Sequence, residues 1–145
     1  TENLYIGRTP KTIHYAFMHE LGIKLVINMR IGLPPRRDPI SPPVSSLWLP
    51  CIDSPLFPIP MSFLKMGAQE ALKVMNNGGA VYTHCSKGRH RGVAMGACIL
   101  VAQGYSAEEA MQLIKQQRPA SDPRVWYIRR RIKQFAKEWA SSTPG

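Results

Sequence analysis

The sequence of 145 residues has no long apolar run, few cysteines and few acidic residues. No apolar stretch approaches the roughly 20 residues that cross a bilayer, and no signal-peptide pattern is visible, so we expect no transmembrane segment. The chain begins without Met, which leaves open a preceding targeting segment. Its three cysteines lack framework spacing, which argues against a disulfide-stapled secreted domain. We therefore expect an intracellular protein of the reducing cytoplasm.

Acidic side chains are outnumbered, with 9 Asp and Glu against 19 Lys and Arg, which gives a formal net charge of +10 and a pI near 10.0. Such a field attracts anions and raises the rate at which they meet the protein. Polyanions gain most from it. We interpret the basic residues within 129–137 as the solvated side of a helix. Weak contact with a membrane surface therefore stays open, and no nucleic acid is required as a partner.

Short apolar runs alternate with amphipathic stretches along the chain. Strand character is found at 4–6, 24–28, 47–52 and 80–84, and helical patterns at 12–21 and 61–77. A proline-rich loop covers 31–46, and three further helices are expected at 93–102, 107–117 and 125–139. This order predicts an α/β fold with a central, mostly parallel β-sheet flanked by helices. At this length we expect one domain over residues 1–145.

Two of the predicted helices carry local signals. In 12–21, Ile13, Phe17 and Leu21 share one helical face. Ser106 and Glu109 have the spacing of a capping box at the start of 107–117, in which each side chain accepts from the other residue's backbone N–H. We therefore expect the first helix to pack through the face of Ile13, and the later helix to begin directly after Ser106.

The segment 80–92, with the sequence AVYTHCSKGRHRG, carries the strongest chemical signal. Cys85 follows a predicted strand, and five residues separate it from Arg91, next to which an apolar helical stretch begins. Loop N–H groups and a helix N-terminus would converge on an anion there, and Arg91 can bind two of its oxygens. The same surroundings favour the thiolate form of a cysteine, which is the attacking species. We therefore predict a phosphate cradle with Cys85 as the nucleophile.

His84-Cys85, five further residues and Arg91 match the His-Cys-x5-Arg signature of the cysteine-dependent protein tyrosine phosphatase superfamily. Residues 1–30 resemble the opening of its compact dual-specificity branch, and 117–119 (Gln-Arg-Pro) resemble a later landmark. The inner loop 87–91 is most similar to that of plant and fungal atypical dual-specificity phosphatases. The resemblance implies a protein tyrosine phosphatase-like fold, phosphate monoester hydrolysis through a phosphocysteine intermediate, and no metal or other cofactor.

Phosphoester cleavage also needs an acid for the departing oxygen, and the chain has only three aspartates. Asp53 follows the strand 47–52, and its separation from Cys85 matches the acid-to-cysteine spacing of the resembled family. We predict Asp53 as general acid and then as general base for water. Asp38 is a weaker candidate, more simply explained by an ion pair with the arginines beside it. Asp122, with a proline after it, is better explained as the N-cap of the last helix.

The other residues of the loop are predicted to bind substrate. They are Ser86, Lys87, Gly88, Arg89, His90 and Gly92. The resemblance gives His84 an indirect role, in which it organises the loop and tunes the thiol. The family usually has Ser or Thr where this chain has Gly92, and that hydroxyl assists expulsion of the thiolate. We therefore expect the intermediate to be hydrolysed more slowly than it forms, unless the hydroxyl of Ser86 takes over this role.

The cysteines and histidines also allow other arrangements. Cys51 could form a protective disulfide with Cys85, although packing within a strand explains it more simply, and Cys98 is interpreted as a core residue. A metal site built from His84, Cys85 and His90 lacks the paired spacing of the usual ligand sets. We therefore expect no metal.

The leading hypothesis is a cysteine-dependent phosphatase acting on phosphotyrosine, phosphoserine or phosphothreonine proteins, or on another polyanionic phosphorylated substrate. Phosphoinositides, inositol phosphates or pyrophosphates, and RNA 5′-phosphates are alternative substrates. A rival of another class is a pseudophosphatase that binds phosphate without turnover, which only Gly92 favours. Sulfur transfer or arsenate reduction could use the same cradle, and for arsenate only Cys51 is placed to resolve the intermediate. We expect the protein to be a monomer.

Overall fold

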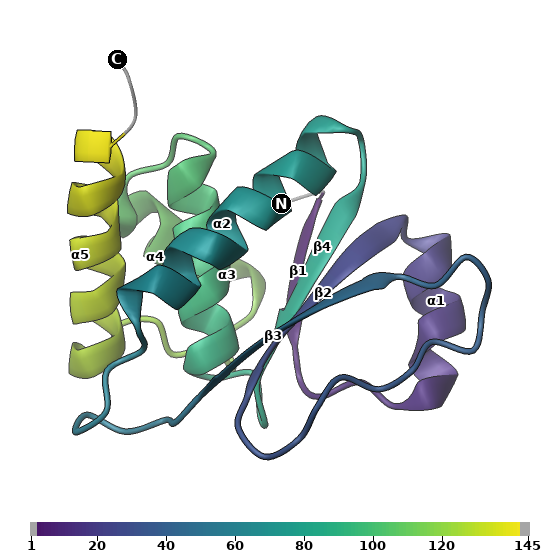
Figure 1. Ribbon diagram of the computed structural model, residues 1–145. Helices are drawn as coiled ribbons and strands as arrows, with labels where there is room; N and C mark the ends of the chain where they lie inside the picture. Colours follow the sequence, from purple (N-terminus) through teal and green to yellow (C-terminus); the bar gives the residue numbers. More distant parts are fainter. Residues whose placement is uncertain (1–2, 143–145) are drawn as a thin grey trace.

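The computed structural model describes residues 3–142, and they form a parallel β-sheet covered by helices (Figure 1). The strands are β1 (Leu4–Gly7), β2 (Ile23–Arg30), β3 (Ser45–Cys51) and β4 (Ala80–His84), in the spatial order β1-β4-β2-β3. All neighbouring pairs run parallel, which confirms the predicted α/β fold. Thr1 and Glu2 of the segment that carries the resemblance, and the last three residues of the expected domain, lie outside the described residues.

Helices lie on both faces of the sheet (Figure 1). A short 3-10 turn (Thr12–His14) and α1 (Tyr15–Glu20) cover one face, and the other carries α2 (Met61–Asn76), α3 (Arg91–Ala102), α4 (Ala107–Gln117) and α5 (Trp126–Ser142). Successive side chains of β2 point to opposite faces. Val26 packs with Tyr15 and Met18, whereas Leu25 and Ile27 pack in the cluster formed with the larger helical layer. Burial on both faces explains why the central strands are almost entirely apolar.

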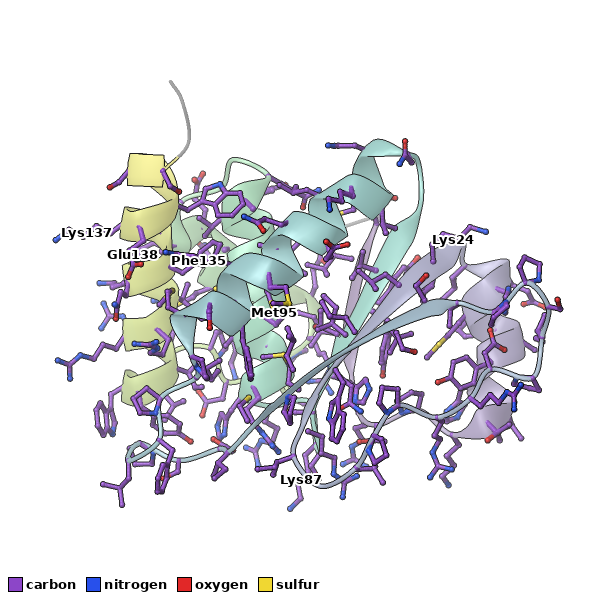
Figure 2. All side chains as sticks on the ribbon, in the orientation of Figure 1. Lys24, Lys87, Met95, Phe135, Lys137 and Glu138 are labelled. Carbon is purple, nitrogen blue, oxygen red and sulfur yellow. The ribbon has the colours of Figure 1, made fainter. Side chains whose placement is uncertain are left out.

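The helix α3 lies at the centre of the larger layer and is buried between the sheet and the helices α2, α4 and α5. Small residues allow this close packing, since an added Cβ at Gly96 would lie 2.4 Å from Ile6 Cδ1. Figure 2 shows Met95 and Phe135 inside the layer, whereas Lys137 points outward. This packing fixes the position of the N-terminus of α3 relative to the end of β4.

The buried face of the segment 12–21 differs from the expected one. Tyr15 and Met18 are 1% and 4% exposed, whereas Ile13 and Phe17 are 79% and 61% exposed. The segment begins as a 3-10 turn, which has about 3.0 residues per turn in place of about 3.6. The apolar positions therefore rotate away from the stripe that a regular helix would form. Leu21, from the expected face, is only partly buried.

The last helix starts later than expected and without the expected cap. Residues 123–125 form a turn, and α5 begins at Trp126. Asp122 is not its N-cap, because its side chain faces His90 and its N–H donates to the Arg89 carbonyl at 2.9 Å.

The capping box of Ser106 and Glu109 at the start of α4 is confirmed in both directions. Across residues 3–142, none of the helices combines the length and apolar composition needed to span a bilayer.

Two neighbouring residues test the corrected face of α1. Met18→Ala should lower the free energy of unfolding by about 2–5 kcal/mol, because the lost side chain leaves a cavity. Phe17→Ala should change it by less than about 0.5 kcal/mol, because the ring is mostly exposed. Urea unfolding followed by circular dichroism measures both values. Equal losses in the two variants would mean that the helix buries the face of Phe17 after all.

Candidate active site

Cys85 directly follows β4, a central strand, at the sheet edge where parallel folds usually place their binding sites. Residues 85–90 connect β4 to the start of α3. Within this loop Gly88 has a φ of +69°, and an added Cβ would lie 2.5 Å from the carbonyl oxygen of Gly7. Only glycine fits both the backbone conformation and the close contact. The loop is thereby held against the end of β1, and Thr9 Oγ1 donates to the Cys85 carbonyl at 2.9 Å.

Arg91 is the first residue of α3, and its side chain is buried beside the loop. Its Nη1 donates to the Cys51 carbonyl at 2.8 Å, which connects the start of α3 to the end of β3. Its Nε is also buried but has no hydrogen-bond partner among the described residues. A buried donor of this kind is usually paired in a folded protein. Arg91 therefore keeps an unpaired buried donor, on a side chain that lines the predicted anion site.

A cavity of about 320 Å³ opens at this end of the sheet. It is lined by Asp53, Cys85, Ser86, Lys87, Arg89, His90 and Arg91. The structure thus brings together the predicted nucleophile, the predicted acid and the predicted oxyanion clamp. Lys87 and Arg89 are exposed at its mouth, and Figure 2 shows Lys87 projecting from the lower end of the molecule. Gly88 and Gly92, predicted to bind substrate, shape the backbone and do not line the cavity.

Asp53 lies just after β3 and is held by two neighbours. Its Oδ1 accepts a hydrogen bond from Tyr127 Oη at 2.6 Å, and its Oδ2 lies 2.8 Å from His90 Nδ1. Burial raises the pKa of Asp53, but the hydrogen bonds from Tyr127 and His90, with the charges of His90 and Arg91, outweigh it and hold the pKa below its ordinary value. Asp53 is therefore a carboxylate at neutral pH when the cradle is empty.

Two residues of this site were not predicted as functional. Tyr127, on the first turn of α5, donates to Asp53, and burial together with that carboxylate raises the pKa of the phenol to about 12. Asp122, expected as a helix cap, has its Oδ2 3.5 Å from His90 Nε2. Asp53 and Tyr127 are 74 residues apart, and no local sequence pattern joins them. The His90 ring is thus engaged by carboxylates on both sides.

His84 lies behind the cradle, 2% exposed, next to the nucleophile. Burial lowers its pKa to about 4, and the charge of Arg30 acts in the same direction. The ring is therefore neutral at pH 7 and cannot supply a positive charge to the thiol. Its Nδ1 lies 3.4 Å from the Cys85 carbonyl, so its contact with Cys85 is through the backbone.

Gly92 lies so close to β4 that a side chain does not fit. An added Cβ would lie 2.9 Å from both Cα and the carbonyl carbon of His84, and 3.1 Å from the Cys85 nitrogen. These are backbone atoms, which cannot rotate away. The Ser or Thr that is usual in the resembled family would therefore require β4 and α3 to move apart. The short distance between the backbones of β4 and α3 therefore explains why position 92 has no side-chain hydroxyl.

The linker between α4 and α5 supports the loop from outside. Arg118 Nη1 donates to the Gly88 carbonyl and, at 3.0 Å, to Ser121 Oγ. The Asp122 N–H donates to the Arg89 carbonyl. Two carbonyl groups of the loop thus have partners on the linker, which holds the loop from the outside.

Asp38 is far from this chemistry. Its carboxylate accepts from the N–H groups of Ile40 and Val44, both at 2.9 Å, and lies 2.7 Å from His19 Nε2. Burial raises its pKa, but these partners outweigh it and the net shift is downward. The expected ion pair with the neighbouring arginines is wrong, because the partner is His19 on α1. Asp38 fastens the proline-rich loop.

The other two cysteines are free and buried, as is Cys85. Cys51 Sγ donates to the Met29 carbonyl at 3.4 Å, and burial raises its pKa to about 12, although the nearby Arg91 charge lowers it. Burial also raises the pKa of Cys98, which lies in the core. Burial therefore disfavours the thiolate form of both, and a Cys51–Cys85 disulfide stays a prediction. Residues 3–142 contain no cluster of three or more potential metal-ligating His, Cys, Asp or Glu side chains.

Comparison with known proteins agrees with this geometry. The family model of the dual specificity phosphatase catalytic domain matches residues 4–137. Dual specificity phosphatase 28 of Mus musculus is 26% identical over 125 residues, which cover 86% of this chain and 74% of that protein. The crystal structure of human DUSP28 has a TM-score of 0.85 at 21% identity and covers 99% of this chain and 97% of that one. PTPMT1 in complex with PI(5)P gives 0.81 at 25% identity, over 97% and 94%.

The chain therefore belongs to the dual-specificity phosphatase catalytic-domain family and is a hydrolase of that type. The resemblance that rested on His84, Cys85 and Arg91 is confirmed at this level. The narrower likeness to plant and fungal atypical members stays a prediction.

The hydrogen bond between Tyr127 and Asp53 can be tested through stability. A carboxyl group whose pKa is lowered on folding contributes stability above its ordinary pKa, and the contribution is lost as the pH falls through the folded value. Tyr127→Phe should therefore destabilise the protein by about 0.5–1.5 kcal/mol at pH 7, toward the lower end because Asp53 is 34% exposed. The difference should vanish near pH 2. Chemical unfolding at both pH values measures it, and a difference independent of pH would contradict the role of Asp53.

Proposed function

We propose that the protein is a cysteine phosphatase in which Cys85 attacks phosphorus, Arg91 binds the phosphoryl oxygens and Asp53 protonates the leaving oxygen. The observation that carries this proposal is the buried Arg91 guanidinium, whose Nε has no partner among the described residues. An unpaired buried donor costs about 1–3 kcal/mol, and an oxyanion in the cradle would remove that cost. Anion binding and nucleophilic attack would then occur at the same point.

The reaction has two steps. Cys85 Sγ forms a bond to phosphorus while the bond to the ester oxygen breaks, and Asp53 gives its proton to that oxygen. Water then attacks the phosphocysteine, Asp53 takes a proton from the water, and phosphate leaves as the thiolate is restored. Loop N–H groups and the N-terminus of α3 stabilise the charge that develops on the phosphoryl oxygens. No step of this sequence requires a metal.

The acid role of Asp53 requires a change of protonation on binding. Its pKa is below the ordinary value in the empty cradle. A phosphate dianion that binds between Arg91 and Asp53 raises the pKa of the carboxyl group, because two negative charges at close range disfavour each other. Substrate binding thus prepares the acid that the first step consumes.

The mouth of the cavity favours a polyanionic substrate. Lys87 and Arg89 are exposed there, and the net charge of +10 adds a long-range attraction. Phosphorylated proteins are the first candidates, in keeping with the family. Phosphoinositides are a second class, supported by the similarity to PTPMT1, whose structure contains PI(5)P. Inositol phosphates and pyrophosphates and RNA 5′-phosphates follow from the same charge.

Phosphate release from a panel of substrates tests the proposal. The panel contains para-nitrophenyl phosphate, phosphotyrosine and phosphothreonine peptides, phosphoinositide vesicles and inositol pyrophosphates, each with a chelator present. Turnover that disappears in Cys85→Ser is the expected result, and the ranking of substrates identifies the class. Vanadate binding without turnover of any substrate would overturn the proposal in favour of a phosphate-binding pseudophosphatase.

The acid assignment predicts a dependence on the leaving group. Asp53→Asn should lower kcat for an alkyl phosphate by about 10²- to 10⁴-fold, because an alkoxide needs protonation to depart. The loss for a phosphoanhydride should be far smaller, since phosphate is a good leaving group. Steady-state phosphate release from both substrates in the same variant measures the contrast. Equal large losses would contradict the assignment.

Gly92 predicts that breakdown of the phosphocysteine limits turnover, because this chain lacks the hydroxyl that usually assists thiolate departure. Rapid mixing with para-nitrophenyl phosphate should show a burst of nitrophenol close to one equivalent per protein. Ser86→Ala serves as the matched variant, since Ser86 lines the cavity and carries a nearby hydroxyl. Slower steady-state release in that variant with an unchanged burst would assign the role to Ser86. Absence of a burst in the unmodified protein would contradict the prediction.

A further inference from the structure

The side chain of His90 lies between two carboxylates that come from different parts of the chain. Its Nδ1 is 2.8 Å from Asp53 Oδ2, after β3, and its Nε2 is 3.5 Å from Asp122 Oδ2, in the linker before α5. The His90 side chain is 22% exposed, less than either partner at 34% and 43%. An imidazole with an acceptor at each nitrogen can satisfy both only when both nitrogens carry protons. Each ring nitrogen of His90 thus lies within ion-pair distance of a carboxylate oxygen.

Tyr127 fixes the orientation of the ring. Its ring meets His90 edge to face, with centroids 5.9 Å apart at an interplanar angle of 65°. Its hydroxyl, which donates to Asp53, lies 3.5 Å from His90 Nδ1. The ring is thereby hydrogen-bonded to Asp53 through Nδ1, while Nε2 lies on the side of Asp122. His90 is thus held as a fixed partner of Asp53 and is not a free loop cation.

Other charged groups around His90 come from three elements. Arg91 follows His90 at the start of α3, and Tyr127 faces it from α5. The loop contributes the other residues that line the same cavity, which are Cys85, Lys87 and Arg89. The three cations disfavour a further positive charge, whereas Asp53 and Asp122 favour it. Among the described residues, the two carboxylates are the charged groups within ion-pair distance of the ring.

In the empty site, the proton that the first chemical step needs is therefore not on Asp53. Asp53 is ionised in the empty cradle, because its hydrogen bonds lower its pKa, yet the first chemical step needs a proton on Asp53. The atom nearest its Oδ2 that can hold that proton is His90 Nδ1. Histidine is the side chain that exchanges a proton most readily between pH 5 and 8.

We propose that His90 holds the proton that Asp53 delivers to the leaving oxygen, and that Asp122 keeps His90 charged until it is used. The proposal rests on the phosphatase function proposed above. When the phosphate dianion binds, the proton moves from His90 Nδ1 to Asp53 Oδ2, and Asp53 passes a proton to the departing oxygen as the P–O bond breaks. In the second step Asp53 takes a proton from the attacking water and returns it to His90. Over one turnover His90 and Asp53 both return to their starting protonation states.

His90→Asn is the discriminating variant, because an asparagine amide can donate to Asp53 Oδ2 from near the position of Nδ1 but carries no transferable proton. The measurement is the pH profile of kcat/KM with two substrates. Phenyl phosphate has a poor leaving group, and para-nitrophenyl phosphate has a good one. With phenyl phosphate the alkaline limb should move down by at least about one pH unit, because the Asn amide cannot hold the proton that Asp53 needs. With the nitrophenyl ester the limb should move much less. Ionisation of each substrate is common to both proteins and cancels.

Asp122→Asn provides a second, milder test. It keeps the shape of the side chain and removes the charge that faces His90 Nε2, so the same limb should move in the same direction by a smaller amount. Inhibition by vanadate reports whether the Cys85–Arg91 cradle is intact, and in Asp122→Asn, whose residue does not line the cavity, it should change less than about threefold.

A uniform fall in kcat/KM at every pH, with the limb unmoved and vanadate inhibition retained, would overturn the proposal and leave His90 a structural role only. This result is distinct from failure of the proposed function, in which the unmodified protein releases no phosphate that depends on Cys85.

Discussion

The burial of the Arg91 guanidinium is the constraint on which the rest of the site depends. Removing such a group from water costs several kcal/mol unless its donors are paired. One donor is paired with the Cys51 carbonyl, which fixes the start of α3 against the end of β3, where Asp53 begins the next loop. This hydrogen bond sets the position of α3 and of the loop before it. The almost entirely buried α3 holds the arginine in place, and its Nε is a buried donor without a partner among the described residues.

The parts of the site that are close together in the sequence could be predicted from it. Strand, loop and helix follow one another without interruption from 80 to 102, so the local order of the cradle can be read from neighbouring residues. Asp53 could also be predicted from the sequence, because it follows a strand that ends at the same sheet edge. The fold was predictable to a similar extent, since buried parallel strands have distinctive apolar runs.

What could not be predicted depends on contacts between distant residues. Asp122 has the local features of a helix cap, but its tertiary contact with His90 takes precedence over that preference. Tyr127 lies on an ordinary amphipathic helix, and only the packing of α5 against the loop after β3 places its hydroxyl on Asp53. On α1, the 3-10 turn at the start shifted the buried face by a fraction of a turn, which no count of apolar spacing would show.

Proteins at 21% and 25% identity have the same arrangement of sheet and helices, so the fold tolerates wide change in sequence. The surroundings of the cradle are where such change can alter chemistry. In this chain the linker before α5 takes part, through Arg118 on a loop carbonyl and through Asp122 on His90. Differences among family members in the handling of protons can therefore arise outside the signature segment.

The tight approach of Gly92 to β4 also limits how this enzyme can change. A single substitution that introduces the usual hydroxyl would have to push apart a central strand and a fully packed helix, and both are held by the core around them. Any gain in the rate of the second step would be offset by the cost of that displacement. The lineage of this chain can thus reach the common form of the loop only through paired changes, one at position 92 and another that moves the backbone of His84. Backbone spacing, fixed by the interior of the protein, thus decides which side chains position 92 can accept.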